Sequence, residues 1–166
     1  MQNKIVVILI CLLVLFSSCD SNQVFDSYKT VSKQWHKDEV ITFTFKAPDT
    51  INSYNLFLNL RNNNDYKYSN LFLIVNLNYP NGKVVTDTLE FQMANPDGSF
   101  LGTGFSDVKQ NKLWFKGIDK PFVFSENGEY KVGIQHAMRE NGEVKGVDNL
   151  QGILDVGFRI ERPEIK

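Results

Sequence analysis

A two-residue alternation of apolar and polar side chains runs through most of this sequence and limits the folds that it can adopt. In YNLFLNLR, residues 54–61, every even position is apolar and most odd positions are polar. This spacing is typical of a β-strand that buries one face. The same alternation recurs in VITFTFKA, NLFLIVNLNYP, TDTLEFQMA, EYKVGIQHAM and LDVGFRIE. No segment shows a comparable helical period, so the sequence predicts an all-β protein.

Turn residues lie between these segments and divide the chain into short strands. YPNGKV separates two alternating runs, and its pair Asn81-Gly82 predicts a type I′ hairpin turn, because both residues tolerate positive φ. Pro163 ends the last run, since proline cannot donate to a ladder. Roughly seven to nine strands, each with one apolar face, predict a two-layer antiparallel β-sandwich, Ig-like or jelly-roll. A small closed barrel is the alternative.

The first residues predict an export signal. Lys4 supplies a positive charge, residues 5–16 are all apolar apart from Cys11, and Ser17 and Ser18 are small. A membrane-spanning helix needs about 20 apolar residues, and this run is shorter. We therefore expect residues 1–18 to be a signal peptide.

Cys19 follows this run directly, and its position resembles that of the acylated cysteine in bacterial lipoproteins. The segment Leu15–Cys19 places small residues before the cysteine, although Phe16 is larger than the aliphatic residue usual there. The chain has two cysteines, and Cys11 lies in the signal run, so no disulfide can form in the mature chain. We predict that Cys19 carries lipid, including palmitate.

Acylation of Cys19 would hold the protein on a membrane. Each buried CH₂ contributes about 0.8 kcal/mol, and two or more acyl chains bind stably where one binds reversibly. The residues that follow, DSNQVFDS, are mostly polar. The predicted organisation is a signal peptide (1–18), a lipidated tether (19–27) and one β-sandwich domain (28–166).

The charge of the chain argues against nucleic-acid binding. The whole chain has a formal charge of −1, and Lys4 is the only charged residue in the signal run, so the mature chain carries −2. Both signs are interspersed, without the basic stripe of nucleic-acid-binding proteins. We therefore predict no nucleic-acid partner.

We found no pattern of metal-binding or catalytic residues. His36 and His136 are the only histidines, and a metal site normally needs three or four converging ligands. His136 shares an alternating face with apolar residues, which predicts a core or edge histidine with satisfied ring nitrogens. Asp87 and Asp155 could approach each other across the sheets, but the sequence does not establish it. We predict no enzyme activity, no metal and no cofactor.

Aromatic residues outside the alternating runs are the candidates for ligand binding. Trp35 and Trp114 are such residues, and β-sandwich domains often present aromatic rings to sugars or proteins. Burial at the ends of the core is the competing interpretation. A carbohydrate-binding sandwich is therefore the alternative function.

The order of motifs along the mature chain resembles one family, the GldH gliding-motility lipoproteins of the phylum Bacteroidota. The resemblance runs through Tyr28 and Trp35, then LNLRNNNDYKYSNLFLIV, DTLEF, DGSFLGTG, NGEYKVGIQHAMRE and LDVGFRIE. Two places depart from the family pattern: Phe100 stands where tryptophan is common, and FSDVKQN replaces an acid-rich loop after Gly104.

The resemblance implies an accessory lipoprotein of the gliding machinery, tied to type 9 secretion and acting by protein contact. Its partners would be the bilayer, through acylated Cys19, and other gliding or secretion proteins of the envelope. Only Asp20 supplies negative charge directly after the cysteine, which favours the outer membrane with the domain facing the periplasm. Thr50 and Thr88 follow aspartate and precede an apolar residue, resembling the O-glycosylation sequon of these bacteria.

Overall fold

A computed structural model of the chain describes residues 21–32, 34–104 and 106–164. Within these ranges the protein is built of β-strands and contains no helix, as the alternation predicts. The strands are β1 (Gln23–Thr30), β2 (Gln34–His36), β3 (Ile41–Lys46), β4 (Asn55–Asn62), β5 (Asn70–Asn78), β6 (Val84–Gln92), β7 (Lys109–Lys116), β8 (Glu129–His136), β9 (Asn149–Gln151) and β10 (Ile153–Glu161).

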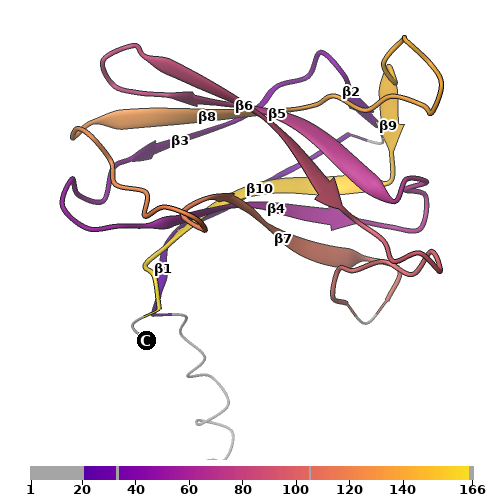
Figure 1. The fold of residues 1–166 in the computed structure, drawn as a ribbon, viewed down its shortest axis with the longest axis horizontal. Coiled ribbons are helices and arrows are strands. Elements are labelled where there is room, and N and C mark those ends of the chain that lie inside the picture. The colour runs from indigo at the N-terminus through magenta and orange to yellow at the C-terminus, as the bar shows by residue number, and fades with distance from the viewer. Residues whose placement is uncertain (1–20, 33, 105, 165–166) are drawn as a thin grey trace, which may run out of the picture.

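The strands form two antiparallel layers that face each other (Figure 1). One four-stranded sheet has the order β1-β10-β4-β7, and the other has the order β3-β8-β5-β6. A short pair, β2 and β9, lies at one end of the sandwich. The predicted two-layer sandwich is confirmed, and the closed barrel is wrong, because no described ladder joins the two four-stranded sheets.

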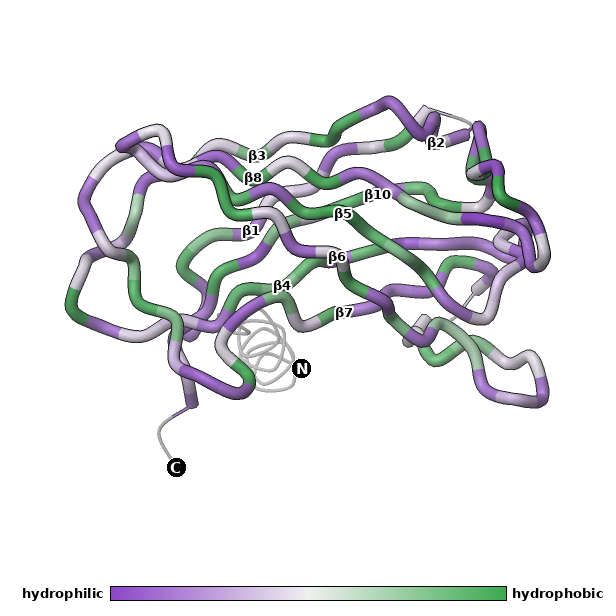
Figure 2. The backbone as a smooth tube through the Cα atoms, turned by 45° about the horizontal axis from the view of Figure 1, so that its top comes forward, coloured by the Kyte–Doolittle hydropathy of each residue, from purple (hydrophilic) through white to green (hydrophobic). Residues whose placement is uncertain are grey.

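The core fills the space between the layers with the apolar residues of the alternating segments. Leu56, Leu58 and Leu60 of β4 are completely buried, as are Phe158 and Tyr130 from the strands around them. Figure 2 shows the resulting change between hydrophobic and hydrophilic residues along the strands. Fully burying one such side chain stabilises the fold by roughly 1.5–3 kcal/mol. Burial of one face of each strand therefore sets the register of both sheets.

The hairpin between β5 and β6 forms where Asn81-Gly82 predicts it, but the turn type is different. Gly82 has a φ of 84°, and none of the described residues other than glycine has positive φ. The Gly82 N–H donates to the Tyr79 carbonyl, and the Tyr79 N–H donates to the Lys83 carbonyl. This is a three-residue loop with glycine at its left-handed position, not a type I′ turn. Pro80 favours it, because its fixed φ suits the first turn position.

The first strand begins earlier than the sequence suggests. β1 starts at Gln23, which pairs with Glu161, so ordered structure extends into the 19–27 segment predicted as a tether. Phe25 explains this start, because it packs against Phe45 and Phe158 with ring centroids 5.5 and 6.1 Å apart. No helix that could cross a bilayer occurs in the part of the chain that the structure describes.

Candidate functional site

The outer face of the β1-β10-β4-β7 sheet carries an aromatic pair beside the point where the chain enters the fold. Trp114 of β7 lies opposite Phe57 of β4, with ring centroids 4.4 Å apart. The Lys112 ammonium lies 4.2 Å from the Phe57 ring centroid on the same face. These two neighbours leave Phe57 only 3% exposed, whereas Trp114 keeps 38% of its surface in solvent. The predicted candidate Trp114 therefore does present an accessible ring.

A shallow hollow of about 550 Å³ opens beside this pair. We call it the Trp114 surface and define it by the residues that line it: Asn55, Phe57, Lys112, Trp114, Gly117, Ile118, Glu161, Arg162, Pro163 and Glu164. Ile118, in the loop after β7, is 63% exposed at its edge. The surface thus combines an aromatic ring, an exposed aliphatic side chain and charges of both signs.

Ion pairs hold the charged groups of this face in place. Arg159 bonds Asp26 at 2.7 Å and also bonds Glu161, and Lys112 bonds Glu161 at 2.7 Å. Burial lowers the pKa of Arg159, but its bonds to Glu161 and Asp26 outweigh burial and raise that pKa above its usual value. Glu161 is therefore neutralised by two cations, and it adds no free negative charge to the Trp114 surface.

The chain enters the domain directly beside this surface. The Arg162 N–H donates to the Asn22 carbonyl at 2.9 Å, and its guanidinium reaches the Ser21 carbonyl at 3.4 Å. Figure 1 shows the start of β1 next to the end of β10 at the lower edge of the sandwich. Cys19, the predicted lipid site, lies outside the described residues.

Trp35 is not available to a ligand, which agrees with the competing interpretation that it is buried at the end of the core. It is fully buried, its indole N–H donates to the Glu39 carbonyl at 3.0 Å, and its ring packs edge-on against His136. β2 and β9 pair through Trp35 and Leu150, which seals this end of the core. Of the two tryptophans, Trp114 is the one that remains a candidate for binding carbohydrate.

His136 is a core histidine, but only one ring nitrogen is satisfied. It is 2% exposed, and its Nε2 bonds the Trp35 carbonyl at 2.9 Å. Its Nδ1 is buried with no hydrogen-bond partner among the described residues. Burial lowers the pKa of His136, the bond to Trp35 opposes this effect, and the nearby charge of His36 adds to it.

This arrangement predicts a pH dependence of stability. Because the folded chain disfavours protonated His136, the unfolded chain binds more protons as pH falls below about 6.5. The free energy of unfolding should therefore decrease between about pH 7 and pH 5. Urea unfolding at several pH values measures this decrease. His136→Gln keeps a donor for the Trp35 carbonyl and should flatten it; an equal decrease in that variant would contradict the assignment.

The acidic residues considered for catalysis lie apart from each other. Asp87, on β6, bonds Lys116 of β7 at 2.8 Å and bridges the two sheets. Asp155, on β10, contacts Arg61 at 3.5 Å and accepts a bond from Thr30. No group of three or more metal-ligating side chains occurs in the ranges that the structure describes.

The two candidate glycosylation residues occupy different settings. Thr88 is exposed on β6, an edge strand that pairs only with β5 among the described strands. Thr50 is half-buried in the turn after β3. In that turn the Asp49 carboxylate accepts bonds from the Tyr54 hydroxyl, from the side chain and backbone of Asn52 and from the Ile51 amide, and these bonds hold its pKa well below the usual value.

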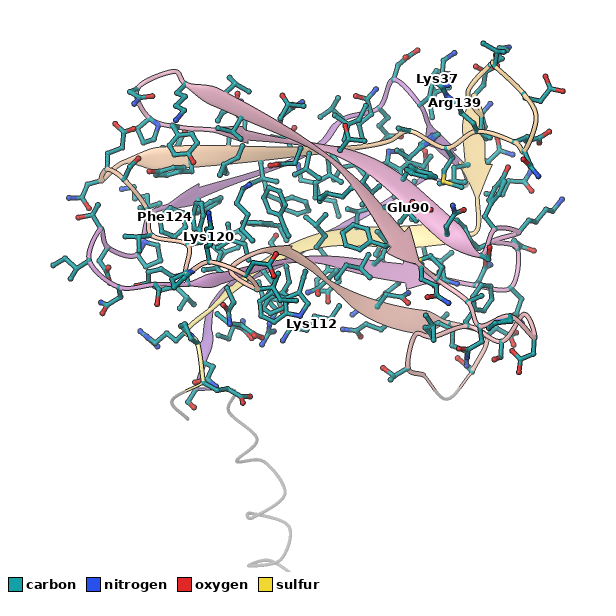
Figure 3. The ribbon with its side chains drawn as sticks, viewed as in Figure 1. Lys37, Glu90, Lys112, Lys120, Phe124 and Arg139 are labelled. Atoms are coloured by element: carbon teal, nitrogen blue, oxygen red, sulfur yellow. The ribbon has the colours of Figure 1, made fainter. Side chains whose placement is uncertain are left out.

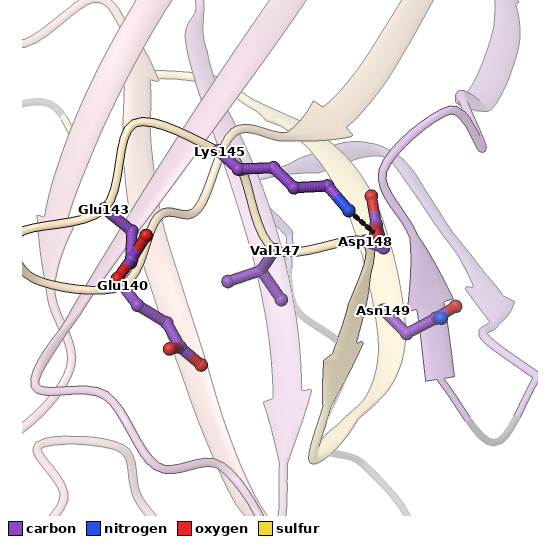
Figure 4. A pocket seen from close by; sticks show the side chains of 7 residues that line it. Glu140, Glu143, Lys145, Val147, Asp148 and Asn149 are labelled. Atoms are coloured by element: carbon purple, nitrogen blue, oxygen red, sulfur yellow. Dashed lines mark hydrogen bonds and ion pairs between the residues drawn. The ribbon is translucent and has the colours of Figure 1, made fainter.

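A second hollow, of about 350 Å³, lies along the loop between β8 and β9 (Figure 4). Its charged side chains are Glu140, Glu143, Lys145 and Asp148, and Lys145 bonds Asp148 at 2.7 Å. Lys37 also bonds Asp148, and hydrogen bonds from both lysines lower the pKa of Asp148 to about 2. These groups are paired across an exposed loop, and nothing in their geometry points to a ligand.

The sequence identified Trp114 as a binding candidate but none of the residues around it, and Phe57 is the one of these that carried a signal. It occupies an outward position of β4, where alternation calls for a polar residue. That break in the alternation was the available signal. An apolar residue on the solvent face of a strand usually has a partner there, and in this protein the partner is Trp114.

The protein is thus a β-sandwich with an open aromatic surface beside the start of β1. The profile of the GldH lipoprotein family matches residues 23–160, which include all ten described strands except the last residue of β10. The chain therefore belongs to the GldH lipoprotein family.

Two relatives extend this match to nearly the whole chain. A gliding motility lipoprotein GldH homolog of Christiangramia forsetii is 52% identical over 159 residues, 96% of each chain. The gliding motility lipoprotein GldH of Flavobacterium johnsoniae is 51% identical over 157 residues, 95% of this chain and 96% of its own.

Similarity to solved structures is much weaker. A family GH115 4-O-methyl-α-glucuronidase with specificity for decorated arabinogalactans has a TM-score of 0.46 and 9% identity, covering 89% of this chain and 18% of its own. The VP2 subviral particle protein of infectious bursal disease virus has a TM-score of 0.37 and 16% identity, covering 87% and 34%. Likeness at this level carries no functional argument.

Proposed function

We propose that this protein is a gliding-motility lipoprotein of the cell envelope, anchored through acylated Cys19. The observation that carries the proposal is identity above 50% with two gliding-motility lipoproteins over at least 95% of the chain. A match over 96% of the chain includes the position of Cys19 as well as the sandwich. The family match over the strands supports the same conclusion.

The protein acts through contact with other envelope proteins and does not catalyse a reaction. Asp87 and Asp155 are each bonded to a basic side chain on separate sheets, so they form no acid–base pair. The hollows described above are shallow and open, unlike the concave sites that surround a small substrate. We propose that its partners belong to the gliding machinery and the linked type 9 secretion apparatus.

The residues that follow Cys19 bear on where in the cell envelope the protein lies. Asp20 is the only acidic residue within six residues after Cys19, so the acidic run of surface-exposed lipoproteins is missing. We propose the outer membrane, with the sandwich facing the periplasm. Thr88 and Thr50 stay predicted O-glycosylation sites, and the exposure of Thr88 makes it the more accessible of the two.

Complementation tests the function. The F. johnsoniae relative shares 51% of its residues with this chain, so the chain should replace it in a strain from which that relative is deleted. We expect such cells to spread over agar when they carry this chain and not when they carry the empty vector. Non-spreading cells that contain the protein in their envelope would contradict the motility assignment.

A further inference from the structure

The Trp114 surface lies within reach of whatever membrane holds the N-terminus. Arg162, which lines the surface, bonds both Asn22 and Ser21. Two Cα steps separate Ser21 from Cys19, a span of at most about 7 Å when fully extended. If Cys19 is acylated, as proposed above, lipid headgroups must therefore lie close to this part of the sandwich.

The side chains of the surface suit that environment. Trp114 is exposed on one side and packed on Phe57 on the other, and Ile118 beside it is 63% exposed. Tryptophan is enriched at membrane interfaces, where its ring meets apolar groups and its N–H meets polar ones. The Lys112 ammonium lies 4.2 Å from the Phe57 ring centroid and bonds Glu161 at 2.7 Å, so it is a paired cation beside the aromatic pair.

The charges that line the surface balance, with Lys112 and Arg162 against Glu161 and Glu164. Glu161 is held by both Lys112 and Arg159, so it presents no free negative charge to anionic lipid. Arg162 is a further cation at the edge nearest the chain entry. Figure 3 shows Lys112 on the lower side of the sandwich, the side on which β1 begins and β10 ends.

We propose that the Trp114 surface rests on the headgroup layer of the bilayer that holds Cys19. Trp114 and Ile118 enter the interface, and Arg162 at its edge faces the lipid phosphates. This proposal rests on the acylation of Cys19. It extends the proposed function by fixing which face of the sandwich is turned toward the membrane and which end is free for a protein partner.

Weak contacts are sufficient because the anchor makes docking intramolecular. A short linker holds two linked sites at an effective concentration on the order of millimolar. A surface with one exposed tryptophan, one exposed isoleucine and balanced charges would not retain a free protein on vesicles, but it can orient a tethered one. The β8–β9 loop, at the upper right of Figure 1, would then point away from the bilayer.

Tryptophan quenching by brominated lipid tests this orientation. The acylated full chain is reconstituted into vesicles of phosphatidylethanolamine and phosphatidylglycerol, with and without bromine in the acyl chains. Trp35 is buried and serves as a constant background. Trp114→Phe removes the reporter and keeps a ring on Phe57. Adding Val144→Trp to that variant places a reporter in the β8–β9 loop, where Val144 is 88% exposed.

We expect brominated lipid to remove the larger part of the Trp114 emission, and to leave the emission of Trp114→Phe and of Trp114→Phe with Val144→Trp unchanged. Equal quenching at positions 114 and 144 would mean free rotation on the tether and would overturn the proposal. No quenching at Trp114 would also overturn it. A change in Trp114 emission on addition of a soluble glycan, without quenching by brominated lipid, would assign the surface to sugars.

Flotation of the vesicles, measured on the same samples, separates these results from a failure of the anchor itself. Protein that does not float would overturn both the acylation and the docking.

Discussion

Gly152→Ala is expected to destabilise the fold by about 3 kcal/mol or more, because it combines backbone strain with a steric clash. Gly152 lies between β9 and β10 with a φ of 82°. A Cβ there would lie 2.1 Å from the Tyr66 backbone nitrogen and 2.5 Å from its Cα. The Asn63 N–H also donates to the Gly152 carbonyl, so neither segment can move away without losing this bond.

Gly82→Ala is the matched control for this prediction. Gly82 has nearly the same φ, 84°, but a Cβ there would meet no atom within 4 Å. The strain of a left-handed alanine alone costs about 1 kcal/mol. Urea unfolding of both variants, in a soluble form that begins at Asp20, should show the larger loss for Gly152→Ala. Equal losses would show that the contact with Tyr66 contributes nothing.

Cys19→Ala is expected to release the protein from the membrane and to abolish its ability to restore spreading. The variant loses every acyl chain, and the remaining contacts of the sandwich are too weak to hold a free protein on lipid. Fractionation should move the protein from the envelope pellet to the soluble fraction. Complementation of the deletion strain measures the loss of function.

Cys11→Ala is the control for that substitution. It removes the other cysteine from within the signal run and leaves an apolar residue in its place. We expect unchanged fractionation and full spreading. Full spreading by a soluble Cys19→Ala protein would show that the sandwich works without its anchor.

Most of the fold could be predicted from the sequence, because burial of one face of each strand produces a local alternation of apolar and polar residues. Every segment singled out for its alternation contains all or most of a strand of the two main sheets. The strands without this alternation were harder to predict. β2 and β9 have three residues each, and β1 carries no regular alternation, so Trp35 looked like a possible ligand platform when it is a core residue.

Contacts between distant residues account for what the sequence did not reveal. The need for glycine at position 152 arises from Tyr66, which is far away in the chain and approaches only in the folded state. The unpaired Nδ1 of His136 likewise depends on how β2 covers β8. Trp114 was identified as a candidate, but its partner Phe57 and its closeness to the chain entry depend on strand order.

Mass spectrometry of the mature N-terminus shows whether Cys19 anchors this sandwich to a membrane. The protein is isolated from the envelope fraction of an expressing strain and digested, and its first peptide is sequenced by fragmentation. We expect a peptide that begins at Cys19 and carries the added mass of a diacylglyceryl group with or without an N-acyl chain. A peptide that begins elsewhere, or that contains an unmodified Cys19, would contradict it.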